Sequence, residues 1–148
     1  MTVVGVDPGG AATGIAVISN RNRYLCHALI LRNGWPTWGH YVRAVVAEIE
    51  PHLDAGATVG VEDVTPPTPH MGLISVRGLL DTARMVGALH YRLGPGTVLV
   101  PPGGHGSLPA EAYPSELIGP REGKALSGRL RHCRSAWDVA CATRKLSL

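Results

Sequence analysis

The sequence has few cysteines and no long apolar run, and each absence excludes a class of protein. The three cysteines, Cys26, Cys133 and Cys141, are widely separated and form no Cys-x-x-Cys pair, so neither a zinc site nor a disulfide framework is predicted. No apolar run reaches the roughly 18 residues that a membrane-spanning helix requires. The first residues are not typical of a signal peptide, because Asp7 interrupts the opening apolar stretch. The sequence therefore predicts a cytoplasmic protein, in the host cytoplasm if its source is viral.

Charged residues are also scarce. They make up 17% of the 148 residues, against 45% for hydrophobic residues, a balance typical of a globular chain rather than a disordered one. The length suits a single domain with a substantial core. No internal repeat and no visible boundary divides the chain, so residues 1–148 are expected to form one domain.

Arginine supplies twelve of the fourteen basic residues, and the basic residues are unevenly placed. The net charge is only +3, but seven basic residues and two acidic ones lie between residues 121 and 148. Two interpretations are open. A basic C-terminal segment suits a partner that carries phosphates, and it equally suits a solubilising surface.

Apolar runs and turn residues predict alternating strands and helices. Thr37 is expected to cap the first helix, and Pro51 to end it. Strands are expected at 2–7, 13–19, 24–32, 57–64 and 96–102, and helices at 38–52, 73–92 and 134–146, with one short helix near 113–118. This order predicts an α/β domain with a mixed sheet and helices covering both faces.

Three carboxylates stand where these elements would bring them together. Asp7 and Glu62 each end an apolar strand, and adjacent parallel strands would place the two ends side by side. Asp138 lies among small and apolar residues on the last helix, which must pack on the sheet. Such a cluster repels itself unless a hard cation such as Mg²⁺ or Mn²⁺ neutralises it. Each residue also has a structural interpretation: a turn former for Asp7, a solvated strand end for Glu62, and a surface ion pair within its own helix for Asp138.

Three segments resemble motifs of the RuvC-like Holliday-junction resolvases, in the ribonuclease-H-like superfamily. VVGVDPGGAATGIAVI resembles their opening strand, Asp-Pro-Gly, Thr-Gly and second strand; TVGVEDV resembles their strand ending in Glu; RHCRSAWDVACA resembles their C-terminal helix. The order and distances of the motifs extend the resemblance over nearly the whole chain. It implies an α/β, ribonuclease-H-like fold, with a mixed five-stranded sheet flanked by helices on both faces and one nuclease domain over residues 1–148. The short chain and its arginine bias suit a phage member.

The resemblance implies that Asp7, Glu62 and Asp138 are catalytic and hold two Mg²⁺ ions per active site, with Mn²⁺ able to substitute. The family's helix usually offers a carboxylate or His three residues before its last Asp, but here that position is Ser135. His132 lies three residues further back, and could replace that ligand only if it hangs from the loop before the helix. Ser135 and His132 are therefore both candidate metal ligands.

The resemblance also implies binding to branched DNA. The basic residues that would contact its phosphates are Arg121, Lys124, Arg129, Arg131 and Arg134. The family's junction-wedging aromatic residue has no counterpart, because the chain has no Phe and the loop after the second core strand offers only His70 and Met71. Trp35 and Trp38 flank a Pro turn and could stack on bases or pack at the start of the first helix.

The implied function is that of a metal-dependent, structure-specific DNA endonuclease, a hydrolase of DNA recombination and repair that resolves Holliday junctions. A homodimer is expected from the family, with no membrane involved, and helix 73–92 suits either its interface or the core. The alternative is a branched-DNA-binding module of the same fold with weak or no activity, for which Ser135 would be the sign of decay.

Overall fold

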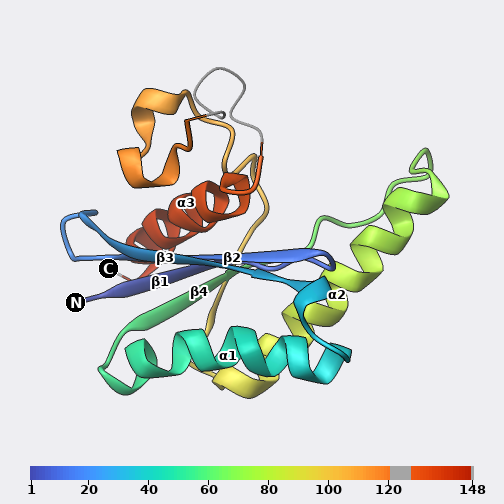
Figure 1. Cartoon of the computed structure of the whole chain (residues 1–148), viewed down its shortest axis with the longest axis horizontal. Coiled ribbons are helices and arrows are strands. Elements are labelled where there is room, and N and C mark those ends of the chain that lie inside the picture. The colour runs from blue at the N-terminus through green and yellow to red at the C-terminus, as the bar shows by residue number, and fades with distance from the viewer. Residues whose placement is uncertain (121–127, 148) are drawn as a thin grey trace.

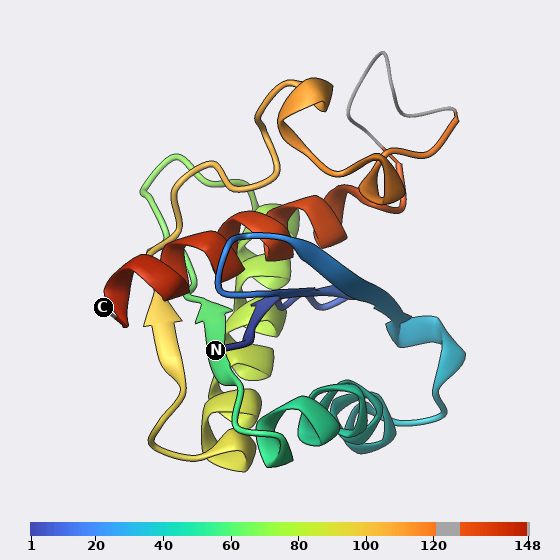
Figure 2. The same ribbon diagram turned by 90° about the vertical axis from the view of Figure 1, so that its left-hand side faces the viewer.

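The computed structural model describes residues 1–120 and 128–147, which form a mixed sheet covered on both faces (Figures 1 and 2). The order of the strands in the sheet is β3-β2-β1-β4-β5. The strands are β1 (Val3–Asp7), β2 (Ala12–Ile18), β3 (Tyr24–Leu31), β4 (Thr58–Glu62) and β5 (Val98–Val100), and the helices are α1 (Trp38–Asp54), α2 (Leu73–Leu93) and α3 (Arg131–Leu146). The predicted five-stranded sheet flanked by helices on both faces is confirmed.

The strand register brings two of the expected carboxylates together. β1 pairs antiparallel with β2 and parallel with β4, and Val6 lies opposite Val61 in the parallel pair. The next residue of each strand is Asp7 and Glu62, so both lie at the same edge of the sheet. Parallel neighbours end together, which confirms the expected adjacency of the two strand ends.

The core has two parts, one on each side of the sheet (Figure 2). On one side α1 and α2 cover the sheet, and their buried apolar residues include Val45, Ile49 and Leu89. On the other side α3 crosses β1 and β2, with Ala136 and Ala140 buried against them. Burial on both faces explains why β1 and β2 read as continuous apolar runs rather than as alternating ones.

α3 lies unusually close to the sheet because glycines face it. A Cβ added to Gly5 would overlap the backbone carbonyl of Ala136, and one added to Gly14 would overlap that of His132. Neither backbone can yield as a flexible side chain would, so these positions require glycine. The close contact fixes where the side chains of α3 lie relative to the end of β1.

Three local expectations are corrected or refined. Thr37 does cap α1, accepting a hydrogen bond from the backbone N–H of His40 at 3.3 Å, but the helix continues past Pro51. Pro51 removes one N–H donor from the i→i−4 ladder, and three more helical residues follow it. The expected short helix is two single 3₁₀ turns, Ala110–Ala112 and Ser115–Leu117. α3 begins earlier than expected, with three more residues at its start.

α2 is amphipathic, and part of its apolar surface is left uncovered. Met85 and Leu89 are fully buried, whereas Leu80 is 63% exposed and Tyr91 is 85% exposed. Neither α2 nor any other helix in the described part of the chain is long and apolar enough to cross a membrane. The fold therefore leaves α2 with a second face that the core does not use.

Candidate active site

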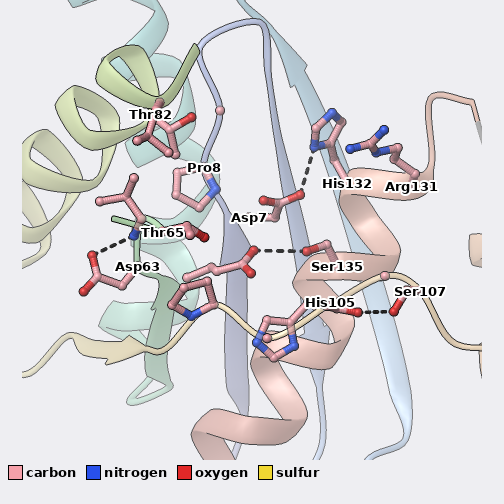
Figure 3. Close-up of a pocket in the computed structure, with 18 residues that line it drawn as sticks. Asp7, Pro8, Asp63, Thr65, Thr82, His105, Ser107, Arg131, His132 and Ser135 are labelled. Atoms are coloured by element: carbon pink, nitrogen blue, oxygen red, sulfur yellow. Dashed lines mark hydrogen bonds and ion pairs between the residues drawn. The ribbon is translucent and has the colours of Figure 1, made fainter. Parts of the chain in front are cut away.

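A cavity of about 920 Å³ opens at the carboxyl ends of β1 and β4 (Figure 3). Its walls come from four parts of the chain: the two strand ends, the start of α3, one side of α2, and the glycine-rich loop after β5. The residues used below that line it are Asp7, Gly9, Glu62, Asp63, His105, Gly106, Arg131, His132 and Ser135. Residues far apart in the sequence thus converge on one open, polar site.

Asp7 and Glu62 form the centre of this site, and they repel each other. Burial, the charge of Asp7 and a hydrogen bond with it together raise the pKa of Glu62 to about 7, against a lowering effect of Ser135. The two carboxyl groups therefore favour a proton or a cation between them near neutral pH. A pair held in this way at the end of two core strands is a strong candidate for function.

The first turns of α3 contact both carboxylates. The Nδ1 atom of His132 lies 2.8 Å from Oδ2 of Asp7, as Figure 3 shows. One turn later, the hydroxyl of Ser135 donates to Oε2 of Glu62 at 3.2 Å. The two candidate replacements for the missing ligand therefore lie on the same face of α3, each beside a different carboxylate. His132 therefore reaches Asp7 from within α3. The sequence predicted that it could reach the site only from the loop before the helix.

Asp138 is held by the loop on the far side of α3. Its Oδ2 atom accepts hydrogen bonds from the Gly106 N–H at 2.7 Å and from the Tyr113 hydroxyl at 2.9 Å. Burial and the hydrogen bond to Asp138 together raise the pKa of Tyr113 to about 12. Asp138 does not line the cavity, but its charge is close enough to contribute to the raised pKa of Glu62.

The donor set suits a hard divalent cation even though no cage of three ligands is preformed. Among residues 1–120 and 128–147, no three His, Cys, Asp or Glu side chains are grouped so that they could hold one ion. Mg²⁺ commonly takes one or two protein carboxylates and completes its octahedron with water and substrate phosphates. Asp7 and Glu62 offer such oxygens, and their mutual repulsion is what a cation relieves. The residues present therefore fit Mg²⁺ or Mn²⁺.

The structure divides the expected DNA-contacting arginines of α3 and its flank into exposed and buried ones. Arg129 and Arg131 are exposed, and Arg131 lines the cavity. Arg134 is wrong as a DNA contact: its side chain is fully buried, and it donates to the carbonyl of Leu117 at 2.9 Å. A guanidinium enclosed by the core cannot reach a phosphate.

Of the remaining expected DNA contacts, two fall outside the described residues and two lie in the loop before α2. Arg121 and Lys124 fall outside the described residues. His70 is exposed and Met71 half-buried in the loop before α2, and neither lines the cavity. The expected contacts of His70 and Met71 with DNA stay a prediction.

Several residues of the site were missed from the sequence. His105 and Gly106 belong to the loop after β5, and Gly106 has a φ of +81° and packs against the backbone of Ser135. Tyr113 reaches Asp138 from the same loop. The available signal was the GGHG stretch directly after a core strand, because such a loop allows the backbone to approach a neighbouring helix closely. Asp63, the residue after Glu62, also lines the cavity.

Comparisons with known proteins support this fold assignment. No family model matches the sequence, and no curated protein matches it. Among solved structures, Thermus thermophilus RuvC in complex with a Holliday junction substrate matches with a TM-score of 0.59 and 18% identity, covering 96% of this chain and 92% of that one. Another structure of Thermus thermophilus RuvC matches with a TM-score of 0.56 and 20% identity over the same shares. The chain therefore has a RuvC-like, ribonuclease-H-like fold.

Proposed function

We propose that this chain is a metal-dependent endonuclease that hydrolyses phosphodiester bonds in branched DNA and resolves Holliday junctions. The observation that carries the proposal is the pair Asp7 and Glu62, two carboxylates that end neighbouring parallel strands at the mouth of the cavity. The fold adds support, because a structural neighbour with the same arrangement of elements was solved with a Holliday junction substrate. Residues 1–148 act as one nuclease domain.

Asp7 and Glu62 would hold the metal, two Mg²⁺ ions per site, with Mn²⁺ able to substitute. Bound there, such ions supply an activated water for in-line attack and stabilise the departing 3′-oxygen, which leaves a 5′-phosphate. Asp138 contributes negative charge from behind the pair. Among the described residues no third side chain is grouped with this pair so that it could hold the same ion, so a substrate phosphate would complete the ligand set.

The protein's own groups orient these carboxylates. His132 donates through Nδ1 to Asp7 and fixes the direction of one of its oxygens, leaving the other for a ligand. Ser135 does the same for Glu62 through its hydroxyl. Since both donors sit on one face of a helix pressed against the sheet, the two carboxylates are held in a fixed relation before substrate arrives.

Positive charge at the mouth of the cavity would position the DNA backbone. Arg131 lines the cavity, and Arg129 is exposed just before the first turn of α3. Phosphate contacts of this kind give register and salt dependence but no sequence specificity. Selectivity for branched DNA would then come from two active sites at a fixed separation in a homodimer.

The exposed apolar face of α2 is the best candidate for that dimer interface. Leu80 and Tyr91 are both more than half exposed and lie on the same helix. Uncovered apolar residues of this size commonly mark protein contacts. A two-fold arrangement would bury the same helix from each copy.

The test is cleavage of a set of DNAs that share one sequence: a four-way junction, a fork, a flap and a linear duplex. In Mg²⁺ the wild type should cut the junction fastest and leave the duplex intact. Asp7→Asn should reduce the rate by about 1,000-fold or more, since a metal ligand contributes several kcal/mol of transition-state stabilisation. Asp54→Asn, a matched change of an exposed Asp at the end of α1, should have no effect.

Binding without cleavage identifies the alternative. An inactive branched-DNA-binding module would bind the junction, tolerate Asp7→Asn and cut nothing under any divalent metal. That result would contradict the proposed enzyme and leave the fold assignment unaffected.

A further inference from the structure

A second group of basic side chains gathers around Trp38, the first residue of α1. Arg84 of α2 lies 4.7 Å from the ring centroid of Trp38, and Arg32, which follows β3, lies 5.8 Å from the same centroid. Trp38 in turn packs edge-on against Tyr41, with their ring centroids 5.6 Å apart at 73°. Two guanidinium groups from different elements therefore converge on one indole.

Within the described part of the chain, neither arginine forms an ion pair with an acidic side chain. Among the residues that the structure describes, the pair of His132 with Asp7 is the only ion pair. Asp81, one turn before Arg84, makes no ion pair, and its carboxyl group lies beside Gly10. Like charges brought together on one ring repel each other, and the cation–π contacts offset only part of that repulsion. An external anion is the group that would complete the arrangement.

The geometry of the cluster suits a phosphate in particular. A guanidinium stacked on an aromatic face keeps its edge N–H groups free, and these match the oxygens of a phosphate in pairs. One guanidinium N–H of Arg32 donates to the backbone carbonyl of Trp35 at 2.8 Å, and this hydrogen bond holds the side chain of Arg32 in place. Trp35 is itself 40% exposed beside it, and an exposed indole can stack on an unpaired base.

The cluster is also tied to the backbone that carries the catalytic aspartate. The Tyr41 hydroxyl donates to the carbonyl of Gly9 at 2.8 Å. Gly9 lines the main cavity, whereas the next residue, Gly10, lines a smaller one of about 360 Å³ together with Arg32. One tight turn therefore separates the two sites, and a strand bound in the cavity could continue across the turn to the arginines.

We propose that Arg32 and Arg84, braced on the ring of Trp38, form a second phosphate-binding site that holds the DNA backbone next to the nucleotide at the active site. The inference rests on the proposed function, because the phosphates belong to the same branched DNA. The inference also goes beyond the proposed function, because it assigns DNA binding to a site outside the metal cavity and outside the basic C-terminal segment. Trp35 provides the adjoining surface for a base.

The experiment measures binding of a fluorescent four-way junction in EDTA, which prevents cleavage, over a series of KCl concentrations. Arg32→Gln and Arg84→Gln should each lower the slope of log affinity against log salt by about one. When the salt concentration rises fourfold, the wild type should lose affinity by a certain factor. A variant that lacks one phosphate contact should lose affinity by a factor about three times smaller. Arg84→Lys should keep the slope and still weaken binding, because it retains the charge without the planar fork.

Arg92→Gln is the matched control. It removes one exposed arginine from the other end of the same helix, so it changes the net charge equally. It should leave the salt slope and the cleavage rate at the wild-type values. Melting temperatures of all variants, measured beside the binding curves, identify any variant that fails to fold, and Arg84→Lys then provides the test at that position.

The outcomes separate the two proposals. If Arg32→Gln and Arg84→Gln show the slope and affinity of Arg92→Gln, the second phosphate site is wrong, whatever the cleavage result. If the wild type binds junctions and cuts none, the proposed nuclease is wrong and the slopes still decide the site. If the wild type binds no DNA, both are wrong.

Discussion

Replacing Asp7 by Asn should stabilise the metal-free protein above pH 8 and fail to do so at pH 5. The pKa of Glu62 is about 7 in the folded chain, against an ordinary value of 4.5. A pKa that is higher in the folded state contributes stability that is complete below pH 4.5 and is lost as the pH rises through 7. Ionised Asp7 is one cause of this loss, and Asn removes its charge.

The size of the effect follows from the same values. The difference between pKa values of 7 and 4.5 lowers the free energy of unfolding by about 3 kcal/mol when Glu62 is fully ionised. Solvent screening at this partly exposed site reduces that loss to about 2 kcal/mol. Burial is the larger cause and remains in the variant, so Asn should restore about 1 kcal/mol, or roughly 2–4 °C in Tm. At pH 5 Glu62 is already protonated in the fold, and the variant loses the ion pair with His132.

The assay is thermal unfolding followed by circular dichroism, in EDTA and then in Mn²⁺. The wild type should gain stability from Mn²⁺ at pH 8, by about 2.7 kcal/mol at a hundred times Kd, and Asp7→Asn should gain none. Glu50→Gln, which changes an exposed carboxylate on α1, should show neither effect. If Asp7→Asn lowers the Tm equally at both pH values and still gains from Mn²⁺, the account of the carboxylate pair is wrong.

Three further predictions follow from the same geometry. Mn²⁺ affinity measured by calorimetry should fall about tenfold from pH 8 to pH 6, because a proton on Glu62 competes with the metal and its pKa is about 7. Tyr113→Phe should weaken Mn²⁺ binding about tenfold, because it releases Asp138 from a hydrogen bond. Tyr24→Phe, which loses a hydroxyl contact with His27, should not weaken it. If Tyr113→Phe and the wild type bind Mn²⁺ equally well, the hydrogen bond between Tyr113 and Asp138 has no role in metal binding. Gly14→Ala should destabilise the fold by about 3 kcal/mol in urea unfolding, because its Cβ overlaps the backbone of α3, and an unchanged midpoint would contradict the close contact.

The parts of the fold that could be predicted are those fixed by local patterns. Apolar runs that end in Asp7 and Glu62 predicted core strands, and the parallel register then brought these ends together. The turn before α1 was predicted from Thr37, whose capping role depends on nearby residues alone. Such features need no knowledge of what lies across the core.

The parts that could not be predicted depend on contacts between distant segments. Asp138 turns toward Gly106 and Tyr113, which lie in a loop without a regular hydrophobic period. Arg134 was predicted to belong to the basic surface. It lies instead on the buried side of α3, where its guanidinium donates to the carbonyl of Leu117. Charge counts carry no information about which face of a helix a residue occupies once both sides of that helix are covered.

The most direct test of the central claim is a crystal of this protein soaked in Mn²⁺ and measured at the manganese absorption edge. The account predicts anomalous density in the cavity within about 2.5 Å of a carboxylate oxygen of Asp7 and of Glu62, and no such density in Asp7→Asn. Manganese bound elsewhere, or an empty cavity in a protein that still cuts four-way junctions, would contradict it.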